Sequence, residues 1–238
     1  MSESRLEKHV AALQKFYGPV PGPPRDPFTL FVWEVLAAHS TPRKRDAALA
    51  ALKRIPALTP DSMWGAPQKK LEAAVATAGP YTEQRLLALR KGVDHFRRAP
   101  DLSKTIRGPV APARRAIKGL PQMSGDGGAY RMLLFAADHA VLPVDARLSR
   151  VARRLGYGAG EQYSSWAPQA RAIRQAIGRD LPADVDVYRR TFIYLSHHGG
   201  ATCTEADPHC RVCPLRGECP AFQNSAASAP KALRRATP

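Results

Sequence analysis

The residues of this chain with the clearest capacity for chemistry are four cysteines near the C-terminus. They follow the spacing C-x6-C-x2-C-x5-C, and the 238-residue sequence contains no other cysteine. Thiolates gathered in so short a stretch are typical ligands of one metal centre. Prolines and a glycine between them suit a chain that turns tightly around a bound group. The candidate ligands are Cys203, Cys210, Cys213 and Cys219.

Three arrangements of these cysteines compete, and the spacing favours one. Disulfides are typical of exported proteins, whereas the first residues, MSESRLEKHV, do not resemble a signal peptide. Zinc ribbons use two C-x2-C knuckles, and only Cys210 and Cys213 form such a knuckle here. A [4Fe–4S] cluster takes four thiolates and accepts one wide loop between them, so we predict a [4Fe–4S] cluster.

The charge of the chain favours a polyanionic partner. Lys and Arg number 36 against 20 Asp and Glu, which gives a net charge of +16 that is spread along the sequence. Nucleic acid is the commonest such partner, although a composition rich in Arg, Ala and Pro can produce the same excess. A membrane surface is the alternative, but no apolar run reaches the length that spans a bilayer. We therefore expect a cytoplasmic protein that binds nucleic acid.

The hydrophobic pattern is helical nearly throughout, without an alternating strand. Ser4 and Glu7 form a capping box before the first helix. Asp26 and Pro27 begin an apolar stretch that predicts a buried central helix. Further helices are expected around 45–53, from 60, over 67–79, 82–96 with Thr82 as its cap, 112–118, 129–138, 145–156, 167–177 and 184–198. The fold class is therefore all-α, and the small, polar, basic segment 223–238 is predicted to be a disordered tail.

A glycine-rich turn, IKGLPQMSGDGGA over residues 117–129, lies between two of these helices. Backbone N–H groups in such a turn, just before a helix begins, favour an anion. In a basic chain we expect that anion to be a backbone phosphate of nucleic acid, which is held without reading sequence. Many glycine-rich turns between helices bind nothing, so this pattern alone is weak. The candidate DNA contacts here are Gln122, Ser124, Gly125 and Gly127.

A carboxylate follows this turn at the start of the next helix. Asp145 stands in LPVD, where an aspartate can be a simple helix cap or a catalytic group. Arg147, Arg150 and Arg154 share one face of that helix, which is either a solvated face or a row of phosphate contacts. We take Asp145 as the catalytic candidate, and Arg147 and Arg150 as DNA contacts.

These motifs, in this order, resemble the endonuclease III family of DNA glycosylases, which has a helix-hairpin-helix motif and an iron–sulfur cluster. The resemblance rests on the glycine-rich turn, the following VDARLSRV and the cysteine spacing. DPFTLFVWEVLAAHST, TPDSMW and LSHHGGATC also fit, so the match covers nearly all of 1–220. It implies two lobes: a six-helix barrel at 27–140, with the hairpin at about 112–138, and an iron–sulfur domain made of 1–26 and 141–222.

The resemblance also implies roles for single residues. Asp145 matches the essential aspartate of the family. His39 falls where the family usually has a glutamine that fills the gap left by a flipped base, although a packed or solvent-facing histidine is an equal alternative. The family hairpin reads L-P-G-V-G-R-K, whereas this chain reads LPQMSGDG from Leu120 and is one residue longer up to Asp145. No lysine occurs between Lys118 and Lys231 to replace the nucleophilic lysine of the bifunctional enzymes.

Breaking an N-glycosidic bond needs a group that stabilises a cationic sugar and a nucleophile for its C1′ atom. A carboxylate such as Asp145 can do the first and activate a water for the second, whereas a lysine would form a Schiff base. Lys118 is the remaining substitute nucleophile. Asp126 places a negative charge at the phosphate-facing turn, which opposes DNA binding unless arginine or metal neutralises it.

We therefore predict a monofunctional, monomeric glycosylase that removes a damaged or mismatched base from double-stranded DNA. Two alternatives stay open at this point. One is a protein that kept the fold and DNA binding but lost the chemistry, and the other is an unrelated iron–sulfur or zinc protein.

Overall fold

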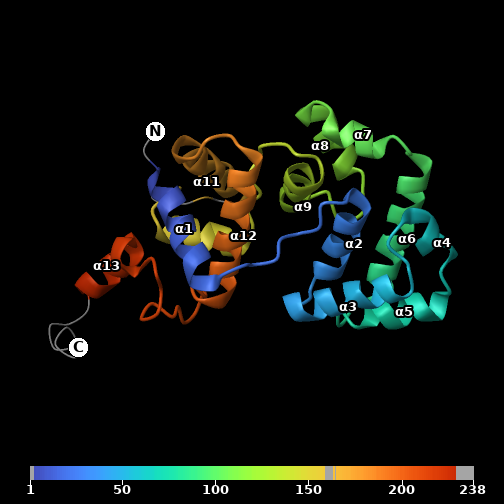
Figure 1. Ribbon diagram of the computed structural model, residues 1–238, viewed down its shortest axis with the longest axis horizontal. Coiled ribbons are helices and arrows are strands. Elements are labelled where there is room, and N and C mark those ends of the chain that lie inside the picture. Colours follow the sequence, from blue (N-terminus) through green and yellow to red (C-terminus); the bar gives the residue numbers. More distant parts are fainter. Residues whose placement is uncertain (1–2, 159–162, 164, 229–238) are drawn as a thin grey trace. The chain divides into compact units, whose positions relative to one another are not determined.

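A computed structural model describes residues 3–158, 163 and 165–228 of the chain. These residues form helices joined by turns and loops and contain no strand, so the predicted all-α class is confirmed (Figure 1). The chain divides into two compact units. We call Pro23–Val141 the hairpin unit, and Met1–Gly22 with Leu142–Pro238 the cysteine unit. The domain boundaries expected from the sequence, at 26/27 and 140/141, stay predictions. No helix in the described ranges is long and apolar enough to cross a membrane.

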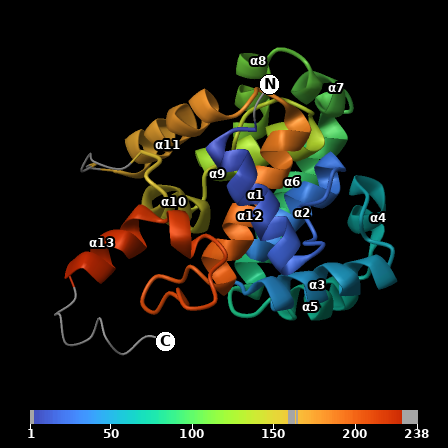
Figure 2. The ribbon, with the colours of Figure 1, turned by 60° about the vertical axis from the view of Figure 1, so that its left-hand side comes forward.

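The hairpin unit consists of short helices packed around one apolar helix. Its helices are α2 (Pro27–Ala37), α3 (Pro42–Arg54), α4 (Pro60–Gly65), α5 (Gln68–Ala76), α6 (Thr82–Arg98), α7 (Leu102–Arg107), α8 (Val110–Lys118) and α9 (Asp126–Arg131), and a π-helical turn, Met132–Ala136, continues α9. Helix α2 packs against α3, α6 and the π-helical turn, and α3 lies beside α5 (Figures 1 and 2). The predicted central helix is therefore the core of this unit.

The start and packing of α2 follow directly from its sequence. The Asp26 carboxylate accepts a hydrogen bond from the Thr29 backbone N–H at 2.7 Å, and Pro27 occupies the first helical position. The ring of Phe31 is fully buried. It lies so close to Gly92 of α6 that a Cβ atom there would be 2.1 Å from the ring. Only glycine lets α6 approach α2 this closely.

The cysteine unit combines both ends of the chain. It contains α1 (Arg5–Tyr17), α10 (Ala146–Arg154), α11 (Trp166–Asp180), α12 (Val185–Ala201), a 3-10 turn (Arg216–Glu218) and α13 (Pro220–Ser228). Helix α12 packs against both α1 and α10 (Figure 2). A Cβ atom at Gly199 of α12 would lie 2.6 Å from the Arg147 carbonyl oxygen, so this glycine permits the close packing of α10 on α12.

Several helix limits differ from the sequence expectations. Tyr81, not Thr82, is the N-cap of α6, and its backbone is left-handed with φ 68°. Helix α9 begins at Asp126, three residues before the expected start at 129, because two adjacent glycines accept helical angles when the following apolar segment is packed. Helix α13 continues to Ser228, because Pro220 starts a helix that includes the first residues of the predicted tail. The remainder of that tail, 229–238, lies outside the described residues.

Candidate functional site

The four cysteines come together around one cavity in the cysteine unit. Its volume is about 220 Å³, and its lining includes all four cysteines together with residues of α10, α12 and α13. Among the described residues, no three His, Cys, Asp or Glu side chains converge closely enough to bind one metal ion. The four thiols surround a common space. An iron–sulfur cluster is bulkier than one ion and holds its thiolates farther apart, so four thiols around a cavity fit such a group.

Electrostatics supports the same fit. Burial raises the pKa of Cys213 and Cys210, and the charges of neighbouring cysteines raise both further. Four thiolates in this space repel one another and need a compensating positive charge, which a metal centre supplies. The guanidinium of Arg154 also contributes, since its Nη1 atom donates to the sulfur of Cys203 at 3.2 Å.

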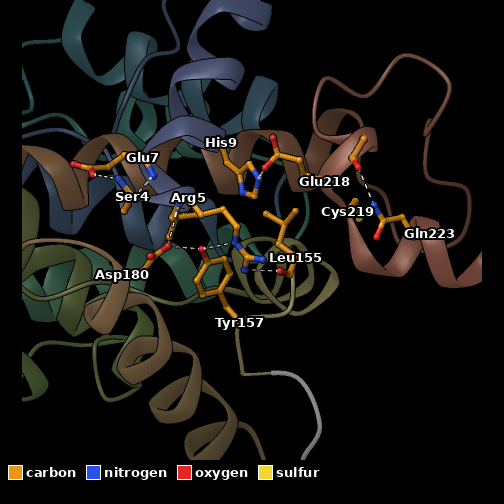
Figure 3. Close-up of polar contacts among 12 residues, drawn as sticks. Ser4, Arg5, Glu7, His9, Leu155, Tyr157, Asp180, Glu218, Cys219 and Gln223 are labelled. Atoms are coloured by element: carbon orange, nitrogen blue, oxygen red, sulfur yellow. Dashed lines mark hydrogen bonds and ion pairs between the residues drawn. The ribbon is translucent and has the colours of Figure 1, made fainter. Parts of the chain in front are cut away.

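Polar contacts around α1 fix the chain beside the last cysteine (Figure 3). The Nε2 atom of His9 lies 3.0 Å from a carboxylate oxygen of Glu218, the residue directly before Cys219. On the same helix, Arg5 donates to the Leu155 carbonyl oxygen at 3.0 Å and to the Tyr157 hydroxyl at 3.3 Å. These bonds join the N-terminal helix to α10 and to the cysteine loop.

The buried hydroxyl of Tyr157 completes this group of contacts. It donates to the Asp180 carboxylate at 2.5 Å (Figure 3). Burial, together with this hydrogen bond, raises the pKa of Tyr157 to about 12. The tyrosine therefore stays protonated over the physiological range and acts as a permanent donor.

Asp145 is the N-cap of α10, as predicted. One of its carboxylate oxygens accepts a hydrogen bond from the Leu148 backbone N–H at 2.7 Å. This bond fixes the orientation of the carboxylate, and the positive end of the helix dipole favours its negative charge. The side chain is half-buried, so its second oxygen can face a ligand. A carboxylate held in this way suits both stabilisation of a cationic sugar and activation of a water.

The arginines of α10 occupy two different settings. Arg147 is exposed. Arg150, half-buried, donates to the backbone carbonyl oxygens of Cys203, at 2.9 Å, and of Gly199. Arg154 donates to the Thr204 carbonyl oxygen at 2.7 Å in addition to the Cys203 sulfur. Arg150 and Arg154 thus hold the start of the cysteine loop, and Arg147 is the one of the three whose position suits a phosphate.

The glycine-rich turn connects α8 to α9. Gln122, Ser124 and Gly125 are exposed, and Gly125 is the N-cap of α9. Gly127 follows in the first turn of the helix and is half-buried. The exposed backbone before α9 is compatible with the predicted phosphate contacts, which stay predictions.

The negative charge of Asp126 is neutralised within the hairpin unit. Its carboxylate lies 2.5 Å from Arg114 and 2.9 Å from the Nζ atom of Lys118. Burial alone would raise the pKa of Asp126, but the hydrogen bonds from Lys118 and Arg114 outweigh burial and lower it. The aspartate therefore does not repel a phosphate as an isolated charge would. The same ion pair engages Lys118, the substitute nucleophile considered above.

A second cavity, of about 510 Å³, lies in the hairpin unit and contains two of the predicted DNA contacts, His39 and Gln122. Both have left-handed backbone angles, with φ 51° and 61°, and so does Tyr81 in the same cavity wall, with φ 68°. These three residues come from the α2–α3 loop, the α8–α9 turn and the start of α6. Non-glycine residues in this conformation are strained, and such strain clusters at functional sites.

Charged side chains also line this cavity. Arg131 makes a two-pronged ion pair with the buried Glu34 of α2, with an Nη2 to Oε2 distance of 2.6 Å. Arg85 is 1% exposed and donates to the Ala38 carbonyl oxygen at 2.5 Å and to that of Gly79 at 3.1 Å, which joins the His39 and Tyr81 loops. The sequence analysis did not identify Glu34, Arg85 or Arg131 as part of a site. The one sequence feature that could have indicated it is Glu34, a glutamate within an otherwise apolar helix.

Together, the fold and these sites define an all-α protein with a helix-hairpin-helix and a four-cysteine loop. No family model matches the chain. Endonuclease III of Treponema pallidum (strain Nichols) is 27% identical to it over 197 residues, which cover 82% of this chain and 84% of that protein.

Solved structures are similar over most of the chain. A non-covalent endonuclease III–DNA complex superposes with a TM-score of 0.71 at 18% identity, covering 96% of this chain and 100% of that one. A thermostable thymine-DNA glycosylase superposes with a TM-score of 0.69 at 18% identity, covering 92% and 97%. The chain therefore has the helix-hairpin-helix glycosylase fold, and its predicted resemblance to endonuclease III is confirmed.

Proposed function

We propose that this protein is a DNA glycosylase of base excision repair that removes a damaged or mismatched base from double-stranded DNA. The observation that carries the proposal is Asp145, a carboxylate held at the start of α10 in a fold shared with endonuclease III bound to DNA. In this proposal Asp145 stabilises the positive charge that develops on the sugar and activates the attacking water. The net charge of +16 supports attraction to DNA.

The DNA contacts belong to the strained cavity of the hairpin unit and to the nearby turn. His39, Gln122 and Tyr81 project from separate loops, so they can enter the space left when a nucleotide leaves the base stack. Ser124, Gly125 and Gly127 supply phosphate contacts through the backbone before α9. Arg147 adds a further phosphate contact from α10.

We propose that the nucleophile is a water, so that the reaction is monofunctional. The state of Lys118, the substitute nucleophile considered above, supports this. A Schiff base needs an unprotonated amine. The Nζ atom of Lys118 lies 2.9 Å from the Asp126 carboxylate, so this amine is engaged in an ion pair within the hairpin unit. We therefore propose little or no cleavage of the DNA strand by β-elimination.

Cys203, Cys210, Cys213 and Cys219 would hold a [4Fe–4S] cluster in the cysteine unit. Four thiols around one cavity, with Arg154 and His198 directed at two of the sulfurs, support this assignment. When bound, the cluster orders the loop that carries it. We further propose that the protein acts as a monomer in the cytoplasm.

The test is a panel of duplexes, each carrying a single damaged or mismatched base, incubated with the purified protein. Free base is measured by mass spectrometry, and binding is measured in parallel at two salt concentrations. Release of at least one base supports the proposal. Salt-sensitive binding to damaged duplexes without release of any base would indicate instead a damaged-DNA-binding protein that lacks the chemistry. Absence of both would contradict DNA repair altogether.

A further inference from the structure

A chain of hydrogen bonds leads from the interior of the cysteine unit to one of the proposed cluster ligands. The Nε2 atom of His198 lies 3.6 Å from the sulfur of Cys213, within hydrogen-bonding distance for sulfur. The other ring nitrogen, Nδ1, lies 2.7 Å from the hydroxyl oxygen of Tyr17, and that oxygen lies 2.6 Å from the Thr202 hydroxyl. Four side chains from α1, α12 and the cysteine loop are thus connected in series.

The ligand at one end fixes the direction of these bonds. A metal-bound thiolate carries no hydrogen and can only accept, so the Nε2 atom of His198 must carry the hydrogen whether the ring is neutral or protonated. In the neutral ring, Nδ1 then accepts from the Tyr17 hydroxyl, and the Tyr17 oxygen is free to accept from Thr202. With these directions every hydrogen in the series has one acceptor. The neutral His198 ring is therefore held as the tautomer that carries its hydrogen on Nε2.

Burial makes this arrangement rigid. His198 is 1% exposed and Thr202 6% exposed. The ring of Tyr17 is further held by the neighbouring His197, whose ring packs edge-on at 4.6 Å between centroids. Because water has little access, the ring of His198 has no competing partner with which to exchange its hydrogen bond to the sulfur.

We propose that His198 is a positioning residue that donates an N–H hydrogen bond to the Cys213 thiolate of the cluster and thereby raises its reduction potential, with Tyr17 and Thr202 fixing its tautomer. Hydrogen bonds to cluster sulfurs are a principal determinant of that potential, because they stabilise the extra electron of the reduced state. Arg154, which donates to Cys203 at 3.2 Å, acts in the same sense on a second sulfur.

The role of His198 rests on the proposed cluster. The experiments therefore measure first whether the cluster is present and then how His198 affects it. Holoprotein is purified without oxygen, and the iron and sulfide content and visible absorption are measured first. Protein that contains no cluster when purified in this way would overturn the cluster assignment and this inference together, while DNA binding and base release would still test the repair function independently.

The midpoint potential of the loaded protein is then measured by voltammetry for His198→Phe and for its neighbour His197→Phe. We expect a shift to lower potential in His198→Phe and a much smaller one in His197→Phe. Tyr17→Phe and Thr202→Val keep the His198 ring and remove only its orienting partners, so they should give intermediate shifts even if His198→Phe does not retain its cluster. Equal potentials for Tyr17→Phe, Thr202→Val and the unmodified protein would overturn the inference.

Resonance Raman spectra give a second readout that packing changes alone do not produce. An N–H donor makes the Fe–S(Cys) stretching bands shift when the protein is exchanged into D₂O. We expect the unmodified protein and His197→Phe to show this deuterium shift and His198→Phe to lose part of it. A deuterium shift that is unchanged in His198→Phe would contradict the hydrogen bond.

Discussion

Two groups of polar side chains, one in each unit of this protein, differ in what they contact. In the cysteine unit, Arg150, Arg154 and His198 point inward and bond to the cysteine loop or its sulfurs. In the hairpin unit, His39 and Tyr81 stand on strained backbone at the wall of an open cavity. Arg150, Arg154 and His198 therefore hold the cysteine loop from within, whereas His39 and Tyr81 border a space that a ligand can enter. This difference predicts that substitutions in the two units fail in different ways.

The largest effect is expected at a proposed cluster ligand. Cys213→Ser removes one of the four proposed thiolate ligands and should abolish most of the bound iron, because a hard hydroxyl is a poor ligand for iron–sulfur iron. The hairpin unit, which has its own core, should retain its helices. Iron analysis and circular dichroism check both points. A variant with full iron content would show that Cys213 is not a ligand.

Asp145→Asn is expected to have the next largest effect. It should slow the release of the base without changing the fold. Asparagine also caps helices, so the fold should persist, while loss of the charge should slow base release by about 10²- to 10⁴-fold. Single-turnover release of base is the measurement. Asp184→Asn, which changes the cap of α12 in the same unit, is the matched control. Unchanged release by Asp145→Asn would remove the catalytic assignment.

Tyr81→Ala tests the cavity of the hairpin unit. Loss of an aromatic ring that stacks on a base costs about 1–3 kcal/mol in single-strand binders, so affinity for a damaged duplex should fall roughly tenfold. The other large exposed aromatic of this unit, Trp64, is 58% exposed and lines a different cavity, which makes Trp64→Ala the control. Equal losses in the two variants would argue against a specific role of this cavity.

The smallest effects are expected for two arginines of α10, and they should differ in kind. Arg147→Ala should reduce the slope of log affinity against log salt by about 1, as expected for loss of one phosphate contact. Arg150→Ala should leave that slope nearly unchanged and instead lower the melting temperature, because Arg150 holds the Cys203 and Gly199 carbonyls. A reversed result would mean that Arg150 leaves its internal partners to bind DNA.

Sequence reasoning was most successful where a local rule applies. The caps Ser4, Asp26 and Asp145 begin their helices as expected, since a cap depends on neighbours three residues away. The gathering of the cysteines also follows from short spacing.

The cavity of the hairpin unit was mostly missed because it depends on distant contacts. Arg85 joins two loops through carbonyl groups some 6 to 47 residues away, and Tyr81 is left-handed although its residue type gives no such signal. The ion pair of Glu34 with Arg131 likewise spans 97 residues. The hydrophobic periodicity of a sequence indicates helices and strands, but it does not indicate which distant residues will contact each other.

The most direct test of the central claim is strand breakage at a released base, followed with and without alkali and with borohydride present. Our account, in which Asp145 directs a water and Lys118 stays paired with Asp126, predicts breakage only after alkaline treatment and no protein–DNA adduct trapped by borohydride. Breakage without alkali, together with a trapped adduct, would contradict it and would identify an amine of this protein as the nucleophile.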